Sequence, residues 1–477
     1  MRNGTPPQFR KVILVTREGR QLYGDSLRGV IVRHDDAPLL DARLLTDPLA
    51  LIEWCAGHFV AAGEGNLIVD IPPVYVWDDG DASRQLREFV QAVKLGGWNA
   101  GAGVELGSGW ITFTAPARPA IHMAVRALMR DDRMLEASLT PNAAVERMCR
   151  YANLIGASYR ATPGVSAIAA LRNRYEGRRV IRRGPFDAGR TVGRPQPRWS
   201  WSPRTDERMM SSGDIHWARR PTPQERKLTR QVIGLDMRAA YLAAAAGVRL
   251  AWNAPHQTGA IMWDPTLAGF YKIDTNGHWW AQSSAQWVPI VNPIRVAADG
   301  SAWVTGPILA YLSEIGEPLP AIIDSYTAPS KEGILREWAE KMRDALPDSC
   351  TAGDPVLRSL IKASYAEGFG MMSRAGGRVQ RSDWHWATMD ECRIRGLRKI
   401  NRAYASHAIP TLPLKIKVDC VWYPQFDGTT VEDMLCALGS DPDDTPHIGH
   451  YRVDKDECGP IDEFLSRHRI KSTETVS

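Results

Sequence analysis

A single carboxylate stands where an apolar, strand-forming segment meets an alanine-rich helical segment. The stretch reads "IGLDMRAAYLAAAAG" over 233–247, with Asp236 at the end of its strand-like part and Tyr241 five residues later. A carboxylate at the end of a strand can hold a divalent cation without burying an unpaired charge. The alternative is that Asp236 caps the N-terminus of a helix at 238–246. The stretch itself leaves both interpretations open.

Four further features follow Asp236 in a fixed order. The pattern predicts a strand running into a helix, then a capped amphipathic helix, then a helix that begins with an N-cap aspartate and a proline, and last two strand-like halves around an Asp–Cys pair. These features are "SAWVTGPILAYLSEIG" at 301–316, "SKEGILREWAEKMRDAL" at 330–346, "DPVLRSLIKASYAEGFGMM" at 354–372 and "LPLKIKVDCVWYPQ" at 412–425.

This order resembles the palm and fingers of family B DNA polymerases, especially the compact protein-primed kind. The family's first motif, D-x-x-S-L-Y-P, is similar to "DMRAAYL" at 236–242, and its second, K-x-x-x-N-S-x-Y-G, is similar to "KASYAEGFG" at 362–370. The third motif, Y-x-D-T-D-S on a hairpin, has "KVDCVW" at 417–422 in its place. A later "GHYRVDKDE" at 449–457 resembles the basic-aromatic motif that enters the thumb. The resemblance covers roughly 231–460.

A narrower resemblance is to the telomere-associated proteins of linear bacterial replicons, in which a palm-like core carries an alanine-rich first motif. It depends on "AYLAAAAG" at 240–247, "HQTG" at 256–259 and "YRATPGVSAIAALR" at 159–172. It implies a protein that binds DNA ends in replication and works with a terminal protein.

The resemblance to family B polymerases assigns roles to individual residues. Two carboxylates would be the catalytic groups and the ligands of Mg²⁺ or Mn²⁺, three residues would bind the incoming nucleotide, and two would hold the primer strand. The two carboxylates are Asp236 and Asp419. The nucleotide-binding residues are Tyr241, Arg358 and Lys362, and the residues that hold the primer strand are Tyr451 and Arg452.

The chain departs from the family pattern where catalysis depends on it. Val421 stands where the third motif has its metal-ligating aspartate, and Asp419 stands two residues earlier. Residues two apart on a strand share a face but lie about 6.5–7 Å apart, so Asp419 is expected to reach the metal only if the hairpin shifts. Ala366 and Glu367 replace the Asn and Ser of the second motif, and Glu367 would repel a triphosphate if it pointed inward.

On this basis we expect a DNA-binding replication protein with a polymerase-like core, acting at primer or telomere DNA ends with weak or no catalysis. One alternative is an active compact DNA-directed DNA polymerase, a nucleotidyltransferase. The other is an unrelated nucleic-acid-binding protein. No paired acids of an exonuclease can be identified in the N-terminal part, so proofreading is not expected.

A basic stretch precedes the polymerase-like motifs. Residues 171–230 hold 16 Arg or Lys against 6 Asp or Glu, with tryptophans among them, as expected of a segment that contacts a polyanion and stacks on bases. The alternative is a solvated, flexible linker whose tryptophans tuck against a neighbouring domain. The predicted DNA contacts are Arg178, Arg179, Arg182, Arg183, Trp199 and Trp201, with Trp217 as a further stacking candidate.

The predicted fold class is α/β, or α+β. The expected domains are a degenerate ribonuclease-H or exonuclease-like domain over 1–175, a basic arm over 176–230, a polymerase-like palm, fingers and small thumb over 231–465, and a flexible tail over 466–477. Amphipathic helices are predicted at 47–63 and 82–97 in the first of these.

Composition sets outer limits on the compartment and the partners. The 477-residue chain is 44% hydrophobic and 24% charged, which is ordinary for a globular protein. Its seven cysteines form no CxxC pair, no apolar run is long enough to span a membrane, and the N-terminus lacks the apolar core of a signal peptide. We therefore expect a cytoplasmic, nucleoid-associated protein whose partner is DNA and not a membrane.

Overall fold

A computed structural model of the chain divides into two compact units. One unit comprises 1–174 together with 344–371, and the other comprises 175–343 together with 372–477. The expected single domain over 231–465 is therefore interrupted, because 344–371 belongs with the N-terminal unit. The structure describes residues 11–16, 21–25, 30–32, 47–59, 64–70, 82–101, 110–125, 141–157, 159–160, 162–175, 180–183, 190–193, 198–199, 216–278, 299–351, 353–374, 379–441, 447–468 and 470.

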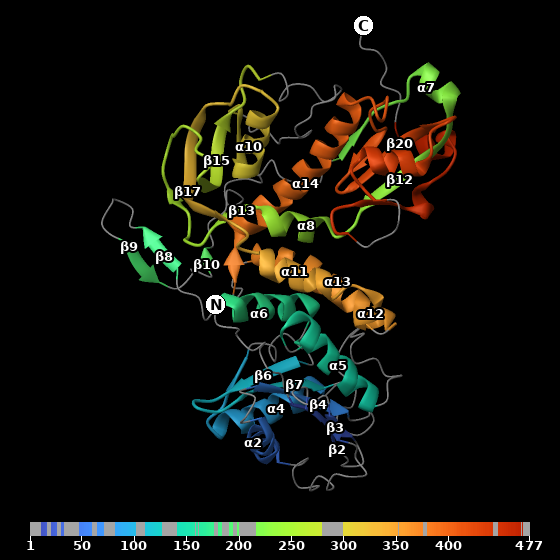
Figure 1. The fold of residues 1–477 in the computed structure, drawn as a ribbon. Coiled ribbons are helices and arrows are strands. Elements are labelled where there is room, and N and C mark those ends of the chain that lie inside the picture. Colours follow the sequence, from blue (N-terminus) through green and yellow to red (C-terminus); the bar gives the residue numbers. More distant parts are fainter. Residues whose placement is uncertain are drawn as a thin grey trace. The chain divides into compact units, whose positions relative to one another are not determined.

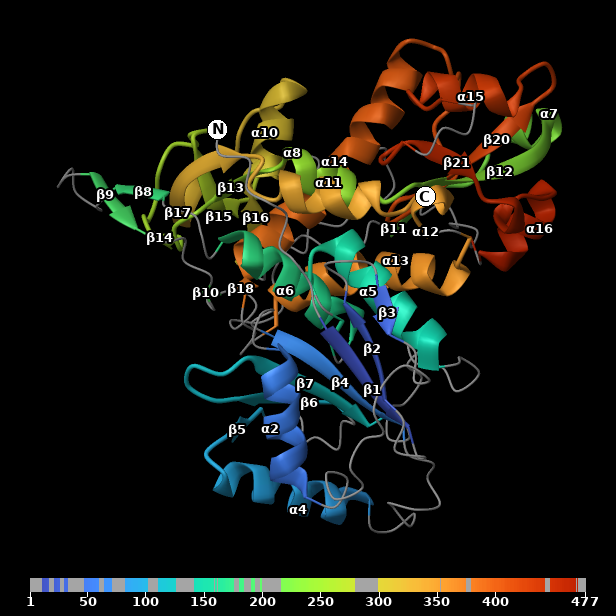
Figure 2. The ribbon, with the colours of Figure 1, turned by 60° about the horizontal axis from the view of Figure 1, so that its bottom comes forward.

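The N-terminal unit is built on a seven-stranded mixed sheet (Figure 2). Its first three strands form an antiparallel meander, and parallel pairs β1–β4 and β4–β7 follow. The order is β3 (Val30–Val32), β2 (Gln21–Asp25), β1 (Lys11–Thr16), β4 (Glu64–Asp70), β7 (Ala120–Val125), β6 (Trp110–Thr114) and β5 (Asn99–Ala100).

Helices complete this unit. The two helices predicted near its start are present as α2 (Pro48–Phe59) and α4 (Ala82–Leu95), and α5 (Pro141–Ile155), α6 (Pro163–Tyr175), the short α12 (Asp348–Thr351) and α13 (Pro355–Met372) follow. α13 contacts α5 through one buried and one partly buried pair of polar side chains. Tyr151 and Ser364 share a hydrogen bond of 2.5 Å, and Arg147 forms an ion pair with Asp354 at 2.8 Å. The Asp354 carboxylate also caps α13, accepting from the amides of Val356 and Leu357 at 3.0 Å as its sequence predicts.

The second unit holds two antiparallel sheets with α14 (Ser382–Ala405) running between them (Figure 1). The first sheet has the order β11 (His216–Ala218), β19 (Lys415–Lys417), β20 (Cys420–Phe426), β12 (Thr229–Met237) and β21 (Tyr451–Val453). The second has the order β13 (Arg249–Ala251), β17 (Ile322–Glu332), β15 (Leu267–Asp274) and β16 (Ser301–Thr305), with β14 (His256–Gln257) also paired to β17.

One hydrophobic core joins these two sheets. It takes side chains from β12, β15, β16 and β20, and from the helices α8 (Ala240–Gly247), α10 (Gly306–Glu314), α14 and α15 (Val431–Ala437). Gly396 lies inside α14 at a point of close contact, where an added Cβ would be 3.4 Å from the Tyr451 hydroxyl. The described elements thus confirm a mixed α/β fold. The remaining elements are α11 (Arg336–Asp344), η7 (Lys455–Glu457), α16 (Ile461–Arg467) and the strand pairing of β10 (Arg198–Trp199) with β18 (Gln380–Arg381).

The segment predicted as a basic arm contains regular structure. β8 (Val180–Arg183) and β9 (Arg190–Gly193) form an antiparallel hairpin. Further along, β11 pairs with β19, and α7 (Pro223–Leu228) leads into β12. Residues 216–230 are therefore part of the folded unit and not a linker, because both ends of this segment pair within the first sheet and α7 lies between them.

The C-terminal end also differs from the expected flexible tail over 466–477. α16 continues to Arg467, and His468 accepts a hydrogen bond on Nδ1 from the Lys415 ammonium at 2.8 Å. Residues 469 and 471–477 lie outside the described residues. Among the helices of the described segments, none is both long enough and apolar enough to cross a membrane.

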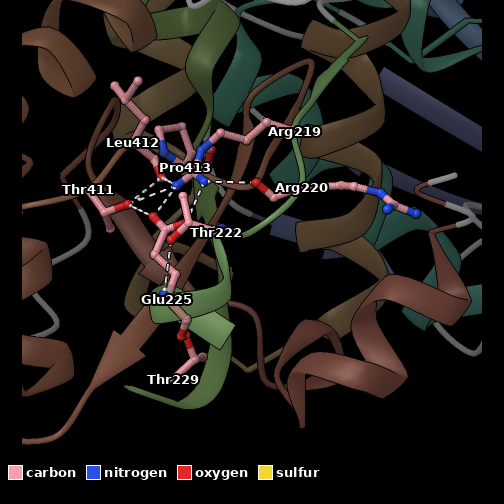
Figure 3. Close-up of polar contacts among 8 residues, drawn as sticks. All are labelled: Arg219, Arg220, Thr222, Glu225, Thr229, Thr411, Leu412 and Pro413. Atoms are coloured by element: carbon pink, nitrogen blue, oxygen red, sulfur yellow. Dashed lines mark hydrogen bonds and ion pairs between the residues drawn. The ribbon is translucent and has the colours of Figure 1, made fainter. Parts of the chain in front are cut away.

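A half-buried ion pair and its hydrogen bonds fasten the segment before β12 to the loop before β19 (Figure 3). The guanidinium of Arg219 donates to both carboxylate oxygens of Glu225 at 2.7 Å, and it also reaches the Thr411 hydroxyl and the Leu412 carbonyl oxygen at 2.8 and 2.6 Å. Glu225 further completes a capping box with Thr222 at the start of α7. Burial by itself would raise the pKa of Glu225, but the hydrogen bonds from Arg219, Thr411 and Thr222 lower it from 4.5 to about 2.

Replacing Glu225 with Gln should destabilise the protein by roughly 1–3 kcal/mol near neutral pH, because the variant cannot form the bidentate, charge-assisted hydrogen bonds with Arg219. The stabilisation from Glu225 is fully present above pH 4.5 and is lost as the pH falls through about 2. Denaturant unfolding over this range should therefore show the difference between wild type and Glu225→Gln shrinking as the pH falls.

The control is Glu463→Gln, which removes a carboxylate from an exposed ion pair with Arg467 at 2.7 Å. Exposed pairs contribute about 0–1 kcal/mol, so this variant should stay close to wild type. Equal destabilisation of the two variants would show that the hydrogen bonds around Glu225 add no particular stability.

Candidate functional site

The two faces of β12 explain why a charge stands at its end. Side chains alternate along a strand, and Ile233, Leu235 and Met237 enter the core between the two sheets. Val232 points to the opposite face, into a smaller cluster with Trp422, Ile461 and Phe464. Gly234 and Asp236 share that second face. Asp236 is therefore outside the main core as a consequence of strand alternation.

The residues that pack over this second face of β12 stop short of Asp236. α16 covers Val232 through Ile461 and Phe464. The backbone near Glu457 approaches Gly234 so closely that an added Cβ would lie 2.6 Å from the Glu457 Cβ atom. The Asp236 side chain keeps 21% of its surface exposed. A carboxylate is tolerated at this position because it retains contact with water.

Asp236 does not cap the following helix, so the alternative interpretation of the stretch is wrong. It lies within β12, and α8 begins only at Ala240. The N-cap residue is Ala239, which has a left-handed backbone with φ of 46° and makes no side-chain cap hydrogen bond. The Asp236 carboxylate is thus available for contacts outside the helix.

Asp419 lies in the tight turn between β19 and β20. Lys417 pairs with Cys420, so the loop between them consists of Val418 and Asp419 only. Val418 has a φ of 58°, an unfavourable conformation for a β-branched residue. Because Asp419 is in the turn, the spacing expected for residues on one strand does not apply to it.

The carboxylates of Asp236 and Asp419 and the thiol of Cys420 come together at this turn. Each offers one ligand atom, and these atoms lie within 4.8 Å of one another. The expectation that Asp419 reaches Asp236 only through a shifted hairpin is therefore wrong. In the described part of the chain, no other three acidic, cysteine or histidine side chains come as close.

Val421 is a core residue and not a vacant ligand position. It pairs with Leu235 across β12 and β20, so both side chains point to the face opposite Asp236. Its side chain is 1% exposed and belongs to the core between the sheets. The residue opposite Asp236 is Cys420. Cys420 received no role from the sequence, although it adjoins Asp419.

Arg452 is the ion-pair partner of Asp236. The two residues are paired across β12 and β21, and the guanidinium donates from Nε and Nη2 to Asp236 Oδ2 at 3.1 and 2.9 Å. The other carboxylate oxygen, Oδ1, faces the Cys420 thiol at 3.5 Å. The sequence assigned Arg452 to DNA alone, and its contact with Asp236 could have been found only from the strand register.

Tyr451, the other residue assigned to the primer strand, is buried. It is 3% exposed in the core between the sheets, and this burial raises the pKa of its hydroxyl well above 10.0. Its ring therefore has no surface for stacking on DNA, which corrects the expected role. Strand alternation explains the difference, because Tyr451 and Arg452 point to opposite faces of β21.

The donor set suits a divalent cation. Carboxylate oxygens are preferred by Mg²⁺ and Mn²⁺, and a neighbouring sulfur favours softer transition metals over Mg²⁺. Burial and the charges of Asp236 and Asp419 raise the pKa of Cys420 to about 12, so the thiol is protonated near neutral pH. The two carboxylates can hold one cation, provided that Arg452 gives up the oxygen it contacts, with the protonated thiol as a neighbour and not a ligand.

The residues assigned to the nucleotide are divided between the two units. Tyr241 lies in the first turn of α8 and packs, half-buried, against the core between the sheets. Arg358 and Lys362 lie on α13 in the N-terminal unit, where Lys362 is exposed. The carboxylate of Glu367 accepts from the Gly164 amide at 3.0 Å within the same unit.

The basic and aromatic residues of the arm are described only in part. Arg178, Arg179 and Trp201 lie outside the described residues, while Arg182 and Arg183 belong to strand β8 and Trp199 to β10. Trp217 is 6% exposed within the core between the sheets, so its ring cannot stack on a base. Neither interpretation of the stretch holds for this residue, because Trp217 belongs to strand β11 of the first sheet and not to a linker.

Comparison with known proteins gives only distant structural similarity. No family model matches the sequence, and no curated protein matches it. Solved structures of Phi29 DNA polymerase are similar over most of both chains. The complex with primer-template DNA and incoming nucleotides has a TM-score of 0.46 and 9% identity, covering 95% of this chain and 85% of that one. The binary primer-template complex has a TM-score of 0.44 and 10% identity, with 93% and 84% coverage. Such low similarity does not establish function.

Changing Val421 to Asp should unfold the protein readily and should not add a metal ligand. An unpaired carboxylate on the core face of β20 is expected to cost on the order of 3–5 kcal/mol. Denaturant unfolding of Val421→Asp and Val421→Ala distinguishes the cost of a buried charge from the cost of a cavity. The Ala variant creates only a cavity and should lose roughly 1–3 kcal/mol of stability.

The pH dependence provides an independent check. Burial raises the pKa of an introduced carboxyl group, so the folded state takes up a proton more readily than the unfolded state. The instability of Val421→Asp relative to Val421→Ala should therefore diminish as the pH falls. If Val421→Asp is as stable as wild type, position 421 does not lie on the core face.

Proposed function

We propose that the protein binds DNA ends during replication and carries a family B polymerase-like palm in its second unit. The observation that carries this proposal is the meeting of Asp236 and Asp419, from two motifs far apart in the sequence, with ligand atoms within 4.8 Å. Their order along the chain and their positions, at the end of one strand and in the adjoining hairpin turn, agree with the motif resemblance. The surplus of positive charge over 171–230 supports a polyanionic partner.

The reaction that this site supports best is transfer of a nucleotide to a DNA primer end. The primer 3′-hydroxyl oxygen would attack the α-phosphorus of the nucleoside triphosphate, pyrophosphate would leave, and the hydroxyl proton would pass to solvent. Asp236 and Asp419 would hold the divalent cation, Mg²⁺ or Mn²⁺, which would supply charge stabilisation. Under this proposal Tyr241, in the same unit as the two carboxylates, contacts the sugar of the incoming nucleotide.

A second candidate is a DNA-end-holding protein with weak or no catalysis. The ion pair between Arg452 and Asp236 favours it, because the guanidinium occupies a carboxylate oxygen that a cation would need. The valine at position 421 no longer favours it, since that side chain points to the other face. A role at telomere ends, together with a terminal protein, is the more specific form of either candidate and depends on the narrower sequence resemblance.

Primer extension with Mn²⁺ and with Mg²⁺ tests the reaction. Wild type should extend a primer in a metal-dependent way, and Asp236→Asn or Asp419→Asn should each slow extension by about a hundredfold or more, because electrostatic stabilisation of several kcal/mol is lost. DNA affinity, measured separately, should remain within a few-fold of wild type. Asp324→Asn is the control, since this carboxylate belongs to β17 in the second sheet.

An inert wild type that still binds DNA would support the end-holding candidate. Failure to bind DNA at any ionic strength would contradict both candidates, because each requires the nucleic acid as partner.

The basic stretch makes its own prediction about DNA binding. Replacing Arg178, Arg179, Arg182 and Arg183 together with Ala should weaken binding to every DNA sequence, because phosphate contacts carry no base information. The slope of log affinity against log salt should flatten by up to about 0.7–0.9 for each phosphate that the variant no longer neutralises. Arg249→Ala, which removes an exposed arginine paired with Glu332, provides the control. An unchanged slope would mean that the four arginines face solvent and do not contact DNA phosphates.

A further inference from the structure

The contact between Arg452 and Asp236 has the properties of an exchangeable ion pair. Both donating nitrogens of Arg452 reach the same oxygen of Asp236, Oδ2, at 2.9 and 3.1 Å. The Arg452 side chain is 50% exposed, whereas that of Asp236 is 21% exposed. An ion pair with one half-exposed partner contributes about 1 kcal/mol or less, so a divalent cation can displace it at small cost.

The buried ion pair of Arg381 with Asp383 in the same unit lacks this property. The guanidinium of Arg381 is fully buried, and it binds Asp383 together with the carbonyl oxygens of Ala251 and Trp252 at 2.6 and 3.0 Å. Removing it from Asp383 would leave several buried groups unsatisfied. Within the described residues, by contrast, the side chain of Arg452 has hydrogen bonds to Asp236 alone. Its release breaks no other hydrogen bond among these residues.

The sheet keeps Arg452 close to the acidic cluster even when the ion pair opens. Asp236 and Arg452 are directly opposite each other on β12 and β21, where Cβ atoms lie about 4.5–5.5 Å apart. The nearby carboxylate of Asp454 is engaged in capping η7, accepting from the Asp456 amide at 3.2 Å. A released guanidinium thus remains exposed beside the cation, where a phosphate group would be its natural partner.

Charge balance links the binding of a cation to the release of Arg452 from Asp236. Without a cation, Arg452 offsets part of the negative charge of Asp236 and Asp419. A divalent cation among the same carboxylates would repel the guanidinium, and a phosphate would attract both. If the cation raises the affinity for phosphate by favouring the released position of Arg452, the phosphate must raise the affinity for the cation by the same factor.

We infer that Arg452 is an exchangeable counter-ion, bound to Asp236 in the metal-free protein and transferred to a phosphate of DNA when a divalent cation binds. This inference rests on the proposed metal site. It makes cation binding and DNA binding cooperative, because the ion pair weakens cation binding until DNA is present. Arg452 is in this sense a positioning residue for phosphate and a competitor of the metal.

The test measures Mn²⁺ binding, by the paramagnetic resonance signal of free Mn²⁺, with and without a primer-template duplex whose 3′ end is dideoxy-terminated. In wild type the duplex should tighten Mn²⁺ binding by about fivefold or more, and Mn²⁺ should tighten duplex binding by the same factor. In Arg452→Gln, Mn²⁺ should bind more tightly without DNA, and the coupling should fall to about twofold or less. Arg452→Lys, which keeps the charge but not the planar fork, should show intermediate coupling.

Lys417→Gln is the matched control. Lys417 is an exposed cation opposite Cys420 and next to the turn that carries Asp419, but Asp236 is not its partner. Removing its charge alters the local potential without removing the counter-ion, so coupling should remain as in wild type. Equal loss of coupling in Lys417→Gln and Arg452→Gln would reduce the effect to general electrostatics and overturn the inference.

Two other results separate this inference from the proposed function. If Asp236→Asn does not weaken Mn²⁺ binding, the metal site lies elsewhere, and both proposals fail. If Asp236→Asn abolishes Mn²⁺ binding but Arg452→Gln keeps full coupling, the metal site stands and only the exchange is wrong. Thermal unfolding of Arg452→Gln verifies that the variant is folded.

Discussion

The register of β12 between β20 and β21 is the constraint on which the candidate site depends. It places Asp236 opposite Cys420 on one side and opposite Arg452 on the other. Because side chains alternate, a slip of one residue would send Asp236 into the core and bring Leu235 to the exposed face. The apolar core formed by Leu235 and Met237 prevents such a slip, so packing on one face of the sheet fixes the chemistry on the other.

Close packing limits the site to one end of the strand. At Gly234 the approach of Glu457 leaves no room for a side chain, and at Val232 the cover comes from α16. Only Asp236 extends beyond this cover. A carboxylate at that point remains partly hydrated and close to Asp419, which is the combination a cation site requires.

The second unit uses its ion pairs for different purposes. Arg219 with Glu225 and Arg381 with Asp383 are surrounded by further hydrogen bonds, and they fasten segments that are far apart or sharply bent. The pair of Arg452 with Asp236 has no such surroundings and is half-exposed. Similar chemical groups therefore stabilise the fold in one place and leave a site open to exchange in another.

The sequence by itself determined the mixed α/β class, the two helices predicted at 47–63 and 82–97, the capped start of α13 and a strand with Asp236 near its end. These follow from local patterns: apolar periodicity, an N-cap followed by proline, and an alternating strand. Local patterns could not determine that 344–371 joins the N-terminal unit, because that depends on contacts such as Tyr151 with Ser364, which are distant in sequence. Nor could they determine to which face of the sheet the side chains of Val421 and Tyr451 point, or that Arg452 contacts Asp236. Pairing register and turn length decide which side chains share a face, and both are set by how the whole sheet packs on its core.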